Sequence, residues 1–425
     1  MQPIQQALGR RVYYGWVVVG VTVLMSLIMW GVRFAPSVLL KPLEEDFGWS
    51  RTEISSALAI GLVMTGFAAV GAGLLMDRFS IRATMLGVLV IGAVAVGLAS
   101  RMSALWHMTL LGGILVGVAT GVSGVFGAPV AARWFVEGRG TVQGILGAGT
   151  SSGQLIFLPL LTWMVVALGW RQATWILAIM TACVIPIVLL LMRDRPADVG
   201  LLPRGATEEP SRAAPPPVRE LLGMAARRPD FWLLAASFFI CGATSTGLIG
   251  QHFQAHALDH GYAAGAAAGA LAVMGSLNFV GVLLSGWLTD RHDPRKLLAI
   301  YYTFRAVSLF FLPFLTDLGI AGLWIFAVVY GLDWIATVPP TMTLCAELFG
   351  QRNVGTIYGF VFGAHQFGAA LLAFLAGYIY DRAGDYTIAF VGAGVLGLVG
   401  GLMAMRIERP ASGPAPGLPT AAPAD

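Results

Sequence analysis

Long apolar runs, separated by short polar turns, dominate the pattern of hydrophobic and polar positions along the chain. Each run approaches or exceeds the roughly 20 mostly apolar residues that a helix needs to cross a membrane. Twelve such runs can be drawn, over residues 14–40, 53–76, 82–101, 105–131, 140–168, 171–192, 230–255, 263–289, 296–316, 320–346, 354–380 and 386–406. The pattern therefore predicts an all-α membrane protein with twelve transmembrane helices.

The runs fall into two sets of six, and a long polar stretch lies between them. It holds charged residues and prolines, including Pro215-Pro216-Pro217, which are typical of an exposed linker. The tail after Arg409 is rich in Ala, Pro and Gly, which indicates disorder. The expected parts are a cytoplasmic N-terminus (1–13), a six-helix bundle (14–192), a cytoplasmic linker (193–229), a second six-helix bundle (230–407) and a disordered cytoplasmic tail (408–425).

The composition supports this interpretation. Hydrophobic residues make up 57% and charged residues 11% of the 425 residues, whereas soluble domains carry about 25% charged residues. A large part of the apolar surface is therefore expected to face lipid. The net charge of +4 is spread over short loops, which argues against nucleic acid as a partner. Cys183, Cys241 and Cys345 lie within apolar runs without metal-binding spacing, so neither a metal nor a cofactor is expected.

Basic residues lie mainly on one side of the expected membrane. The side that holds both termini and the linker carries 19 lysines and arginines, and the opposite side carries 5. The positive-inside rule then places the termini and the linker in the cytoplasm and the chain in the cell inner (plasma) membrane. The first run is longer than the roughly 7–15 apolar residues of a signal peptide, so it is expected to remain as the first helix.

One loop motif occurs in both halves. Residues 73–83 read GLLMDRFSIRA and residues 286–296 read GWLTDRHDPRK, and Asp77 and Asp290 are 213 residues apart. Matching segments at one offset indicate a duplicated six-helix unit. The charged turn either sets the topology only or exchanges partners between two conformations, and the second interpretation makes these loops gates. The candidate gating residues are Gly73, Asp77, Arg78, Gly286, Asp290 and Arg291.

With this motif in both halves, twelve helices and a long central linker, the chain resembles the major facilitator superfamily. Within it, YYGWVVV (13–19), LLKPLEEDFGWSRTEIS (39–55) and RWFVEGRGTVQGILGAGTSSGQLIFLP (133–159) look like segments of the monocarboxylate transporter family and its bacterial relatives. The resemblance implies two pseudo-symmetric six-helix bundles around a cavity that opens to each side in turn. It also implies that the substrate is a short-chain carboxylate, often moved with a proton, and we expect the protein to function as a monomer.

Three charged residues lie well inside the apolar runs, where a charge is costly and is expected to have a role. Arg33 lies roughly 10–12 Å below the Lys41 end of the first helix, where it either binds a substrate carboxylate or reaches out to the membrane interface. Arg305 and Asp333 lie near mid-membrane on consecutive antiparallel helices, so they could meet. They form either a permanent neutral pair or a site in which Arg305 binds substrate and Asp333 releases a proton.

The other polar candidates are less specific. Animal members of the family place an Asp and an Arg one turn apart in the eighth helix, and this chain has Asn278 and Val282 there. Proton coupling is then either absent or has moved to Asp333, His252 or His365, since histidine can take up a proton near neutral pH. Asn278 and the two histidines are also candidate ligands of the substrate. The remaining substrate candidates, which could equally be helix-packing residues, are Gln154, Gln366 and Tyr330.

The chain shows neither a Gly-Lys-Ser/Thr nucleotide loop nor a nucleophile with its base, so gradient-driven transport is expected rather than an enzyme. Pro339-Pro340 should break the tenth helix locally. The expected function is secondary active transport of a small monocarboxylate such as lactate or pyruvate, coupled to H+. The alternatives are an anion exchanger of the oxalate/formate type and an exporter of an unrelated small molecule.

Overall fold

The computed structural model describes residues 13–137, 139–206, 218–316, 318–350 and 354–408, and these residues form helices joined by short turns. The first half consists of α2 (Gly15–Phe47), α3 (Arg51–Phe79), α4 (Ile81–Ala99), α5 (Leu105–His107), η1 (Met108–Leu115), α6 (Val116–Ser123), α7 (Gly127–Trp134), α8 (Arg139–Leu168), α9 (Trp170–Leu191) and η2 (Pro196–Val199). The second half consists of α10 (Val218–Ala226), α11 (Pro229–Gly242), η3 (Ala243–Ile249), α12 (Gly250–Asp259), α13 (Ala264–Thr289), α14 (Pro294–Thr316), α15 (Ile320–Asp333), α16 (Val338–Phe349), α17 (Val354–Ala383) and α18 (Thr387–Met405).

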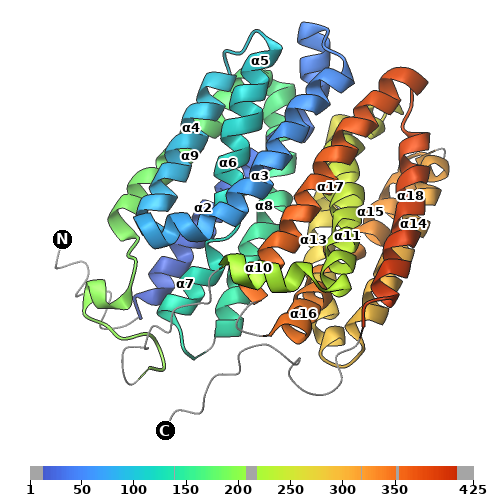
Figure 1. The fold of residues 1–425 in the computed structure, drawn as a ribbon. Helices are drawn as coiled ribbons and strands as arrows, with labels where there is room; N and C mark the ends of the chain where they lie inside the picture. The colour runs from blue at the N-terminus through green and yellow to red at the C-terminus, as the bar shows by residue number, and fades with distance from the viewer. Residues whose placement is uncertain (1–12, 138, 207–217, 317, 351–353, 409–425) are drawn as a thin grey trace.

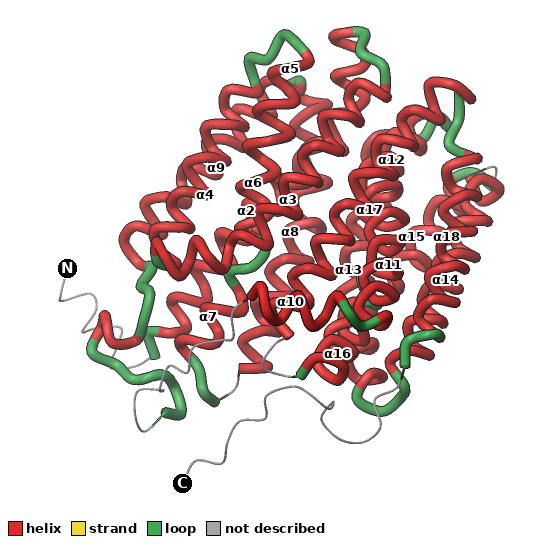
Figure 2. Tube along the Cα trace, in the orientation of Figure 1, coloured by secondary structure: helices red, strands yellow, loops and turns green. Residues whose placement is uncertain are grey.

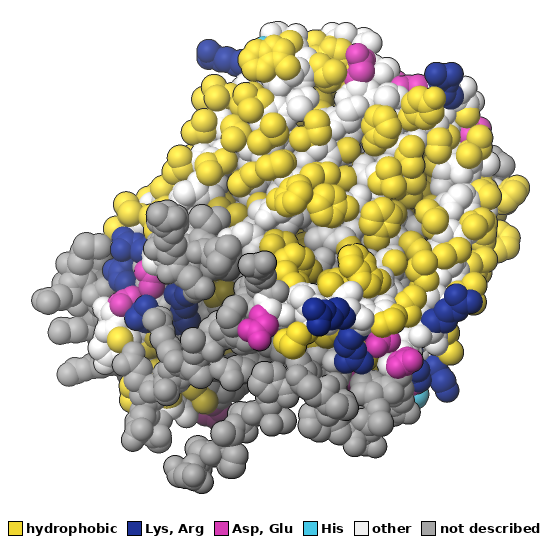
Figure 3. All heavy atoms as spheres, viewed as in Figure 1, with side chains coloured by type: hydrophobic (Ala, Val, Ile, Leu, Met, Phe, Trp, Pro, Cys, Tyr) yellow, Lys and Arg dark blue, Asp and Glu magenta, His cyan; other side chains and the backbone are white. Residues whose placement is uncertain are grey.

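Eleven helical segments are long and apolar enough to cross a membrane, counted over the described residues. The run predicted over 140–168 is α8, which contributes the shorter apolar stretch Leu155–Leu168. Large apolar side chains cover the middle of the face shown in Figure 3, and charged side chains lie toward its two ends. This is the distribution expected of a protein surrounded by lipid. The prediction of an all-α, multi-pass membrane fold is confirmed.

The helices form two bundles that lie side by side (Figures 1 and 2). In the first bundle α2 packs against α8 and α9, and α4 packs against α9. In the second bundle α11 packs against α17, and α14 packs against α18. The bundles meet where α3 packs against α17, α8 against α13 and α2 against α12. Any path between the bundles is therefore bordered by these three helix pairs.

The two ends of the molecule carry different elements (Figure 1). At one end, called the α5 end below, lie α5 and the turns that follow α2, α12 and α17. At the other, called the α10 end, lie α7, α10 and the last turn of α16. A tight turn at the α5 end joins α2 to α3: Gly48 adopts a left-handed conformation with φ of 67°, and its N–H donates to the carbonyl of Glu44. Ser50 and Glu53 then form a capping box that fixes the first turn of α3 and so places Arg51.

The tenth span is interrupted between Asp333, where α15 ends, and Val338, where α16 begins. The sequence predicted a break at Pro339-Pro340, and the break lies just before these prolines, which occupy the first turn of α16. A proline has no N–H to donate to the carbonyl four residues earlier. The chain therefore leaves the helix ahead of the two prolines, and they start the next helix without a lost hydrogen bond of their own.

Part of the segment between the bundles is folded rather than exposed, which corrects the expectation for the linker. The main chain of Arg204 is hydrogen-bonded to the end of α7 and the residues just after it: it donates to the carbonyl of Trp134 at 3.0 Å and accepts from the N–H of Val136 at 2.9 Å. Further along, α10 buries Leu221 and Ala225 in the core of the second bundle. These short stretches are surrounded by prolines and charged residues, so the sequence did not indicate that they pack against the bundles.

Candidate functional site

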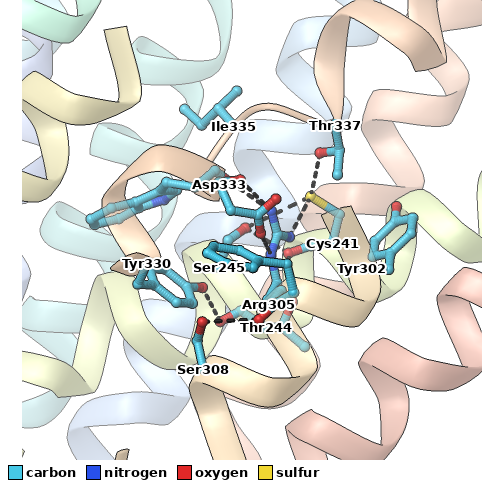
Figure 4. A network of polar contacts seen from close by, with 12 residues as sticks. Cys241, Thr244, Ser245, Tyr302, Arg305, Ser308, Tyr330, Asp333, Ile335 and Thr337 are labelled. Carbon is cyan, nitrogen blue, oxygen red and sulfur yellow. Dashed lines mark hydrogen bonds and ion pairs between the residues drawn. The ribbon is translucent and has the colours of Figure 1, made fainter. Parts of the chain in front are cut away.

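Arg305 on α14 and Asp333 at the end of α15 form an ion pair inside the second bundle (Figure 4). Nε of Arg305 lies 2.8 Å from Oδ2 of Asp333, and the two side chains are 0% and 2% exposed. The sequence placed the two residues at similar depth on neighbouring helices, and the structure brings them together. Such a pair is neutral as a unit, which permits it to lie among apolar helices.

The other nitrogens of Arg305 also have acceptors in the protein. Nη2 donates to the carbonyls of Asp333 at 2.8 Å and of Trp334 at 3.0 Å, and Nη1 donates to the thiol of Cys241 at 3.0 Å. The last carbonyls of a helix have no partner within that helix. Arg305 therefore caps the broken end of α15 in addition to balancing the charge of Asp333.

Two side chains of α13 complete the support of the break. Oδ1 of Asn278 accepts from the N–H of Ile335 at 2.9 Å, and Oγ of Ser285 donates to the carbonyl of Ala336 at 2.6 Å. Ala336 lies four residues before Pro340, so the hydroxyl of Ser285 replaces the N–H that the proline lacks. Asn278, predicted as a substrate ligand, is bonded to the protein main chain in this conformation.

A thiol links the break to α17. Sγ of Cys241 on α11 lies 3.1 Å from Oγ1 of Thr337, and it is hydrogen-bonded to the ring of His365 as well as to Arg305. The chain of contacts thus runs from α15 through α14 and α11 to α17. The sequence gave no sign that Cys241 belongs to a polar cluster, because it lies within an apolar run.

Two buried atoms at the ends of this chain have no hydrogen-bond partner among the described residues: Oδ1 of Asp333 and Nδ1 of His365. The His365 ring is stacked on Phe362, with ring centroids 5.5 Å apart, and packs against Phe238 at 4.8 Å. A buried polar atom without a partner is costly. Both atoms are therefore candidate positions at which a proton or a polar ligand binds.

Gln366 and Tyr330 differ in whether their polar side-chain atoms have hydrogen-bond partners. Gln366 on α17 is fully buried, and neither its amide oxygen nor its amide nitrogen has a partner among the described residues. It faces the first bundle, since a Cβ atom built at Gly66 on α3 would lie 3.1 Å from Cβ of Gln366. The hydroxyl of Tyr330, by contrast, donates to the carbonyl of Thr244 at 3.1 Å within the second bundle.

Arg33 on α2 is a cation of a different kind. Its side chain is half-buried, and its guanidinium carbon lies 5.4 Å from the centroid of the Trp30 ring. No described residue offers it a carboxylate or a hydrogen-bond acceptor, in contrast to Arg305. A guanidinium carries five donors in a fixed fork that suits a carboxylate. Arg33 is thus a cation with its donors available to a ligand.

His252 and the predicted gating residues of the second half lie on other parts of the fold. His252 on α12 is fully buried near the α5 end, with Nδ1 3.1 Å from the hydroxyl of Tyr386 and Nε2 2.8 Å from the carbonyl of Ala373. At the α10 end, Nη1 of Arg291 donates to the carbonyl of Trp287 at 3.1 Å. Gly286 lies in the last turn of α13, and Asp290, its C-cap, lines a cavity of about 280 Å³. The side chains at Gln154, Gly73, Asp77 and Arg78 lie outside the described set.

Sequence reasoning missed a second charged cluster, at the α5 end. Arg51 contacts Asp259, from the other bundle, through both terminal nitrogens, and Lys41 contacts the same carboxylate. The residues were visible as loop charges, but nothing in the sequence pairs positions so far apart. No group of three or more His, Cys, Asp or Glu suited to a metal occurs among the described residues.

Comparison with known proteins gives a consistent result. Residues 21–373 match the model of the Major Facilitator Superfamily. A monocarboxylate transporter 13 of Rattus norvegicus is 25% identical over 91% of this chain and 87% of its own length, and an oxalate:formate antiporter of Oxalobacter formigenes is 24% identical over 87% and 86%. An uncharacterised MFS-type transporter of Bacillus subtilis is 27% identical over 88% and 90%.

Solved structures show the same fold. A bacterial homologue of the human lysosomal transporter Spinster superposes with a TM-score of 0.71 at 14% identity, covering 93% of this chain and 95% of that one. A D-xylose-proton symporter superposes with a TM-score of 0.70, also at 14% identity, over 93% and 98%. These relatives and neighbours are transporters rather than enzymes. The chain therefore belongs to the major facilitator superfamily of membrane transporters.

Proposed function

We propose that this protein carries a small monocarboxylate, such as lactate or pyruvate, together with a proton across the cell inner membrane by alternating access. The observation that carries the proposal is Arg33, a half-buried cation without an acceptor among the described residues. A cation held within a span is costly and is expected to bind an anion. The names of two relatives, a monocarboxylate transporter and an oxalate:formate antiporter, support a carboxylate as that anion.

Arg33 is better suited to this role than Arg305. A carboxylate that approached Arg305 would have to displace Asp333 and two helix-terminal carbonyls. It would also leave the carboxylate of Asp333 buried without its counter-ion, which is strongly unfavourable. Arg33 needs no such exchange, and α2, the helix that carries it, packs against α12 of the other bundle. Gln366, whose amide is unpartnered and faces α3, is the proposed hydrogen-bonding partner of the same substrate.

The proposed proton sites are Asp333 and His365. Each is buried with one polar atom unpartnered, and the two are connected through Arg305 and Cys241. Protonation of Asp333 would remove the charge that balances Arg305, which makes the pair sensitive to the proton in a way that a purely structural pair need not be. His252 is the weaker candidate, because both of its ring nitrogens already have partners.

We further propose that the α10 end faces the cytoplasm, in agreement with the excess of basic residues on that side of the sequence. The two related loops, around Asp77 and Asp290, then lie at the cytoplasmic surface, where they would act as the gate of that side. In this proposal the arginines of both loops exchange hydrogen-bond partners when the bundles tilt.

The proposal is tested by reconstituting the purified protein in liposomes and measuring uptake of labelled lactate, pyruvate, formate and oxalate, each with and without an inward proton gradient. We expect lactate or pyruvate to accumulate only when the gradient is imposed, and unlabelled monocarboxylates to compete. Uptake of none of the four acids by protein that is folded and oriented would contradict the carboxylate assignment.

Anion exchange is the second candidate, favoured by the oxalate:formate antiporter among the relatives. The same liposomes distinguish it. An exchanger takes up labelled acid only when the liposomes are preloaded with an anion, and it is indifferent to the proton gradient. An exporter of an unrelated molecule would show neither dependence.

A further inference from the structure

Arg51, the first residue of α3, reaches across the junction between the bundles. Nη1 lies 2.5 Å from Oδ2 of Asp259, and Nη2 lies 2.8 Å from Oδ1 of the same carboxylate, which is a two-pronged ion pair. Nη1 also donates to the hydroxyl of Tyr386 at 2.8 Å, and the guanidinium lies 3.6 Å from the centre of the Tyr380 ring. The side chain of Arg51 is 0% exposed. All three partners belong to the second bundle, so this contact joins α3 to α12, α17 and the turn before α18.

Asp259 binds a second cation of the first bundle. Nζ of Lys41 on α2 lies 2.6 Å from Oδ1 of Asp259, on the oxygen that also accepts from Arg51. Glu44, one turn after Lys41, accepts from Nε of Arg51 at 3.2 Å. One carboxylate of the second bundle therefore holds two helices of the first, and an acidic residue of the first bundle orients the arginine.

A second carboxylate of the other bundle caps α3. Oδ1 of Asp381 on α17 accepts from the N–H of Arg51 at 3.2 Å, and Oδ2 accepts from the N–H of Thr52 at 2.8 Å and from its hydroxyl at 2.5 Å. The first N–H groups of a helix have no partner within it, and a negative charge is favourable there. The start of α3 is thus completed by a residue from the facing bundle.

α3 and α17 approach each other closely beside this cluster. A Cβ atom built at Gly377 would lie 2.5 Å from Oγ of Ser55 and 2.7 Å from the carbonyl oxygen of Arg51. Toward the middle of the span, a Cβ built at Gly66 would lie 3.1 Å from Cβ of Gln366, and one built at Gly363 would lie 3.8 Å from Cγ2 of Val70. Gly377 therefore permits a close approach of the two helices beside the charged cluster.

We propose that Arg51, Asp259 and Asp381 form the gate that closes the α5 end, and that these contacts break whenever the transport path opens at that end. The full burial of Arg51 strengthens its ion pair in the closed state, and in the open state its charge regains its hydration. The cluster therefore sets the balance between the two states. The proposal rests on the alternating access proposed above, but it is independent of the substrate.

The test uses a reporter thiol placed behind the gate. Thr162 on α8 is 4% exposed and lies 3.4 Å from Nε2 of Gln254 on α12, so it faces the junction near the α5 end. The Thr162→Cys protein is labelled with a membrane-impermeant maleimide added to the α5 side of vesicles of known orientation, without any substrate, and labelling of the parent chain is subtracted. We expect Asp259→Asn or Arg51→Gln to accelerate labelling by about tenfold or more, because removing one partner of a buried pair strongly disfavours the state that contains it.

The matched control is Asp46→Asn. Asp46 lies at the same end and accepts from Arg171 at 2.6 Å, but both residues belong to the first bundle, and their side chains are 40% and 49% exposed. We expect this variant to label like the parent. Equal labelling of the Asp259→Asn and parent proteins, with both showing the same elution volume and melting temperature, would overturn the gate. Equal acceleration by Asp46→Asn would overturn it as well. Because no substrate is present, failure of the carboxylate assignment leaves this result unaffected.

Discussion

The guanidinium of Arg305 lies 2.8 Å from the carboxylate of Asp333 and 2.8 Å from the main-chain carbonyl of the same residue. One arginine thus serves both as the counter-ion of a buried acid and as the cap of the helix that ends at that acid. Arg305 binds both the carboxylate of Asp333 and the main chain at the end of α15. A change in the protonation of Asp333 would therefore alter the contacts that hold the interrupted part of the tenth span.

The first prediction concerns this pair. Asp333→Asn leaves the buried Arg305 without a counter-ion, so we expect it to lower the free energy of unfolding by about 3–5 kcal/mol. The double variant Arg305→Met/Asp333→Asn removes both charges and should lose less than the sum of the two single changes. Thermal unfolding of the purified proteins in detergent measures both effects. Strict additivity would show that the ion pair does not stabilise the fold.

The second prediction separates the two possible roles of Asn278. Asn278→Ala leaves the N–H of Ile335 without its acceptor, which should cost about 1–3 kcal/mol. Ser276→Ala on the same helix is the control, because the hydroxyl of Ser276 donates to the carbonyl of Ala272 within α13. Melting temperatures of the two variants test this. An Asn278→Ala protein of unchanged stability that no longer transports would instead assign Asn278 to the substrate.

The sequence was enough to predict features that depend on a local residue pattern or on a residue's depth in the membrane. The apolar runs predicted the spans, and the equal depth of Arg305 and Asp333 predicted that they could meet. It could not reveal that Arg51 meets Asp259, since the two are 208 positions apart and both looked like ordinary loop charges. Nor could it show that the donors of Arg305 are taken by main-chain carbonyls, because this depends on where the tenth span breaks.

The third prediction concerns the close approach of α3 and α17. Gly377→Val places carbon atoms where Ser55 and the carbonyl of Arg51 now lie, so the bundles cannot close fully at the α5 end. We expect faster labelling of the Thr162→Cys reporter, as for the gate variants. Gly392→Val on α18 is the control, because no described atom lies within 4 Å of its Cβ position. Similar labelling of the two glycine variants would argue against a closed junction at Gly377.

The fourth prediction concerns proton coupling through His365. His365→Gln keeps a polar side chain between Phe362 and Cys241 but cannot carry the proton. We expect the variant to lose accumulation driven by a proton gradient while it retains exchange of labelled for unlabelled substrate at equal pH. Loss of both activities in a folded variant would indicate that His365 contacts the substrate instead, and retention of both would remove it from the proton path.

The central claim is that Arg33 is the cation that holds the substrate carboxylate. It is tested most directly by the initial rate of monocarboxylate uptake in Arg33→Gln, Arg33→Lys and Arg171→Gln proteoliposomes. Arg171 is the matched control, because it also lies over a tryptophan, at 4.3 Å from the Trp170 ring, but is paired with Asp46. The account predicts a loss of about tenfold or more for Arg33→Gln, a smaller loss for Arg33→Lys and none for Arg171→Gln. Full transport by Arg33→Gln would contradict it.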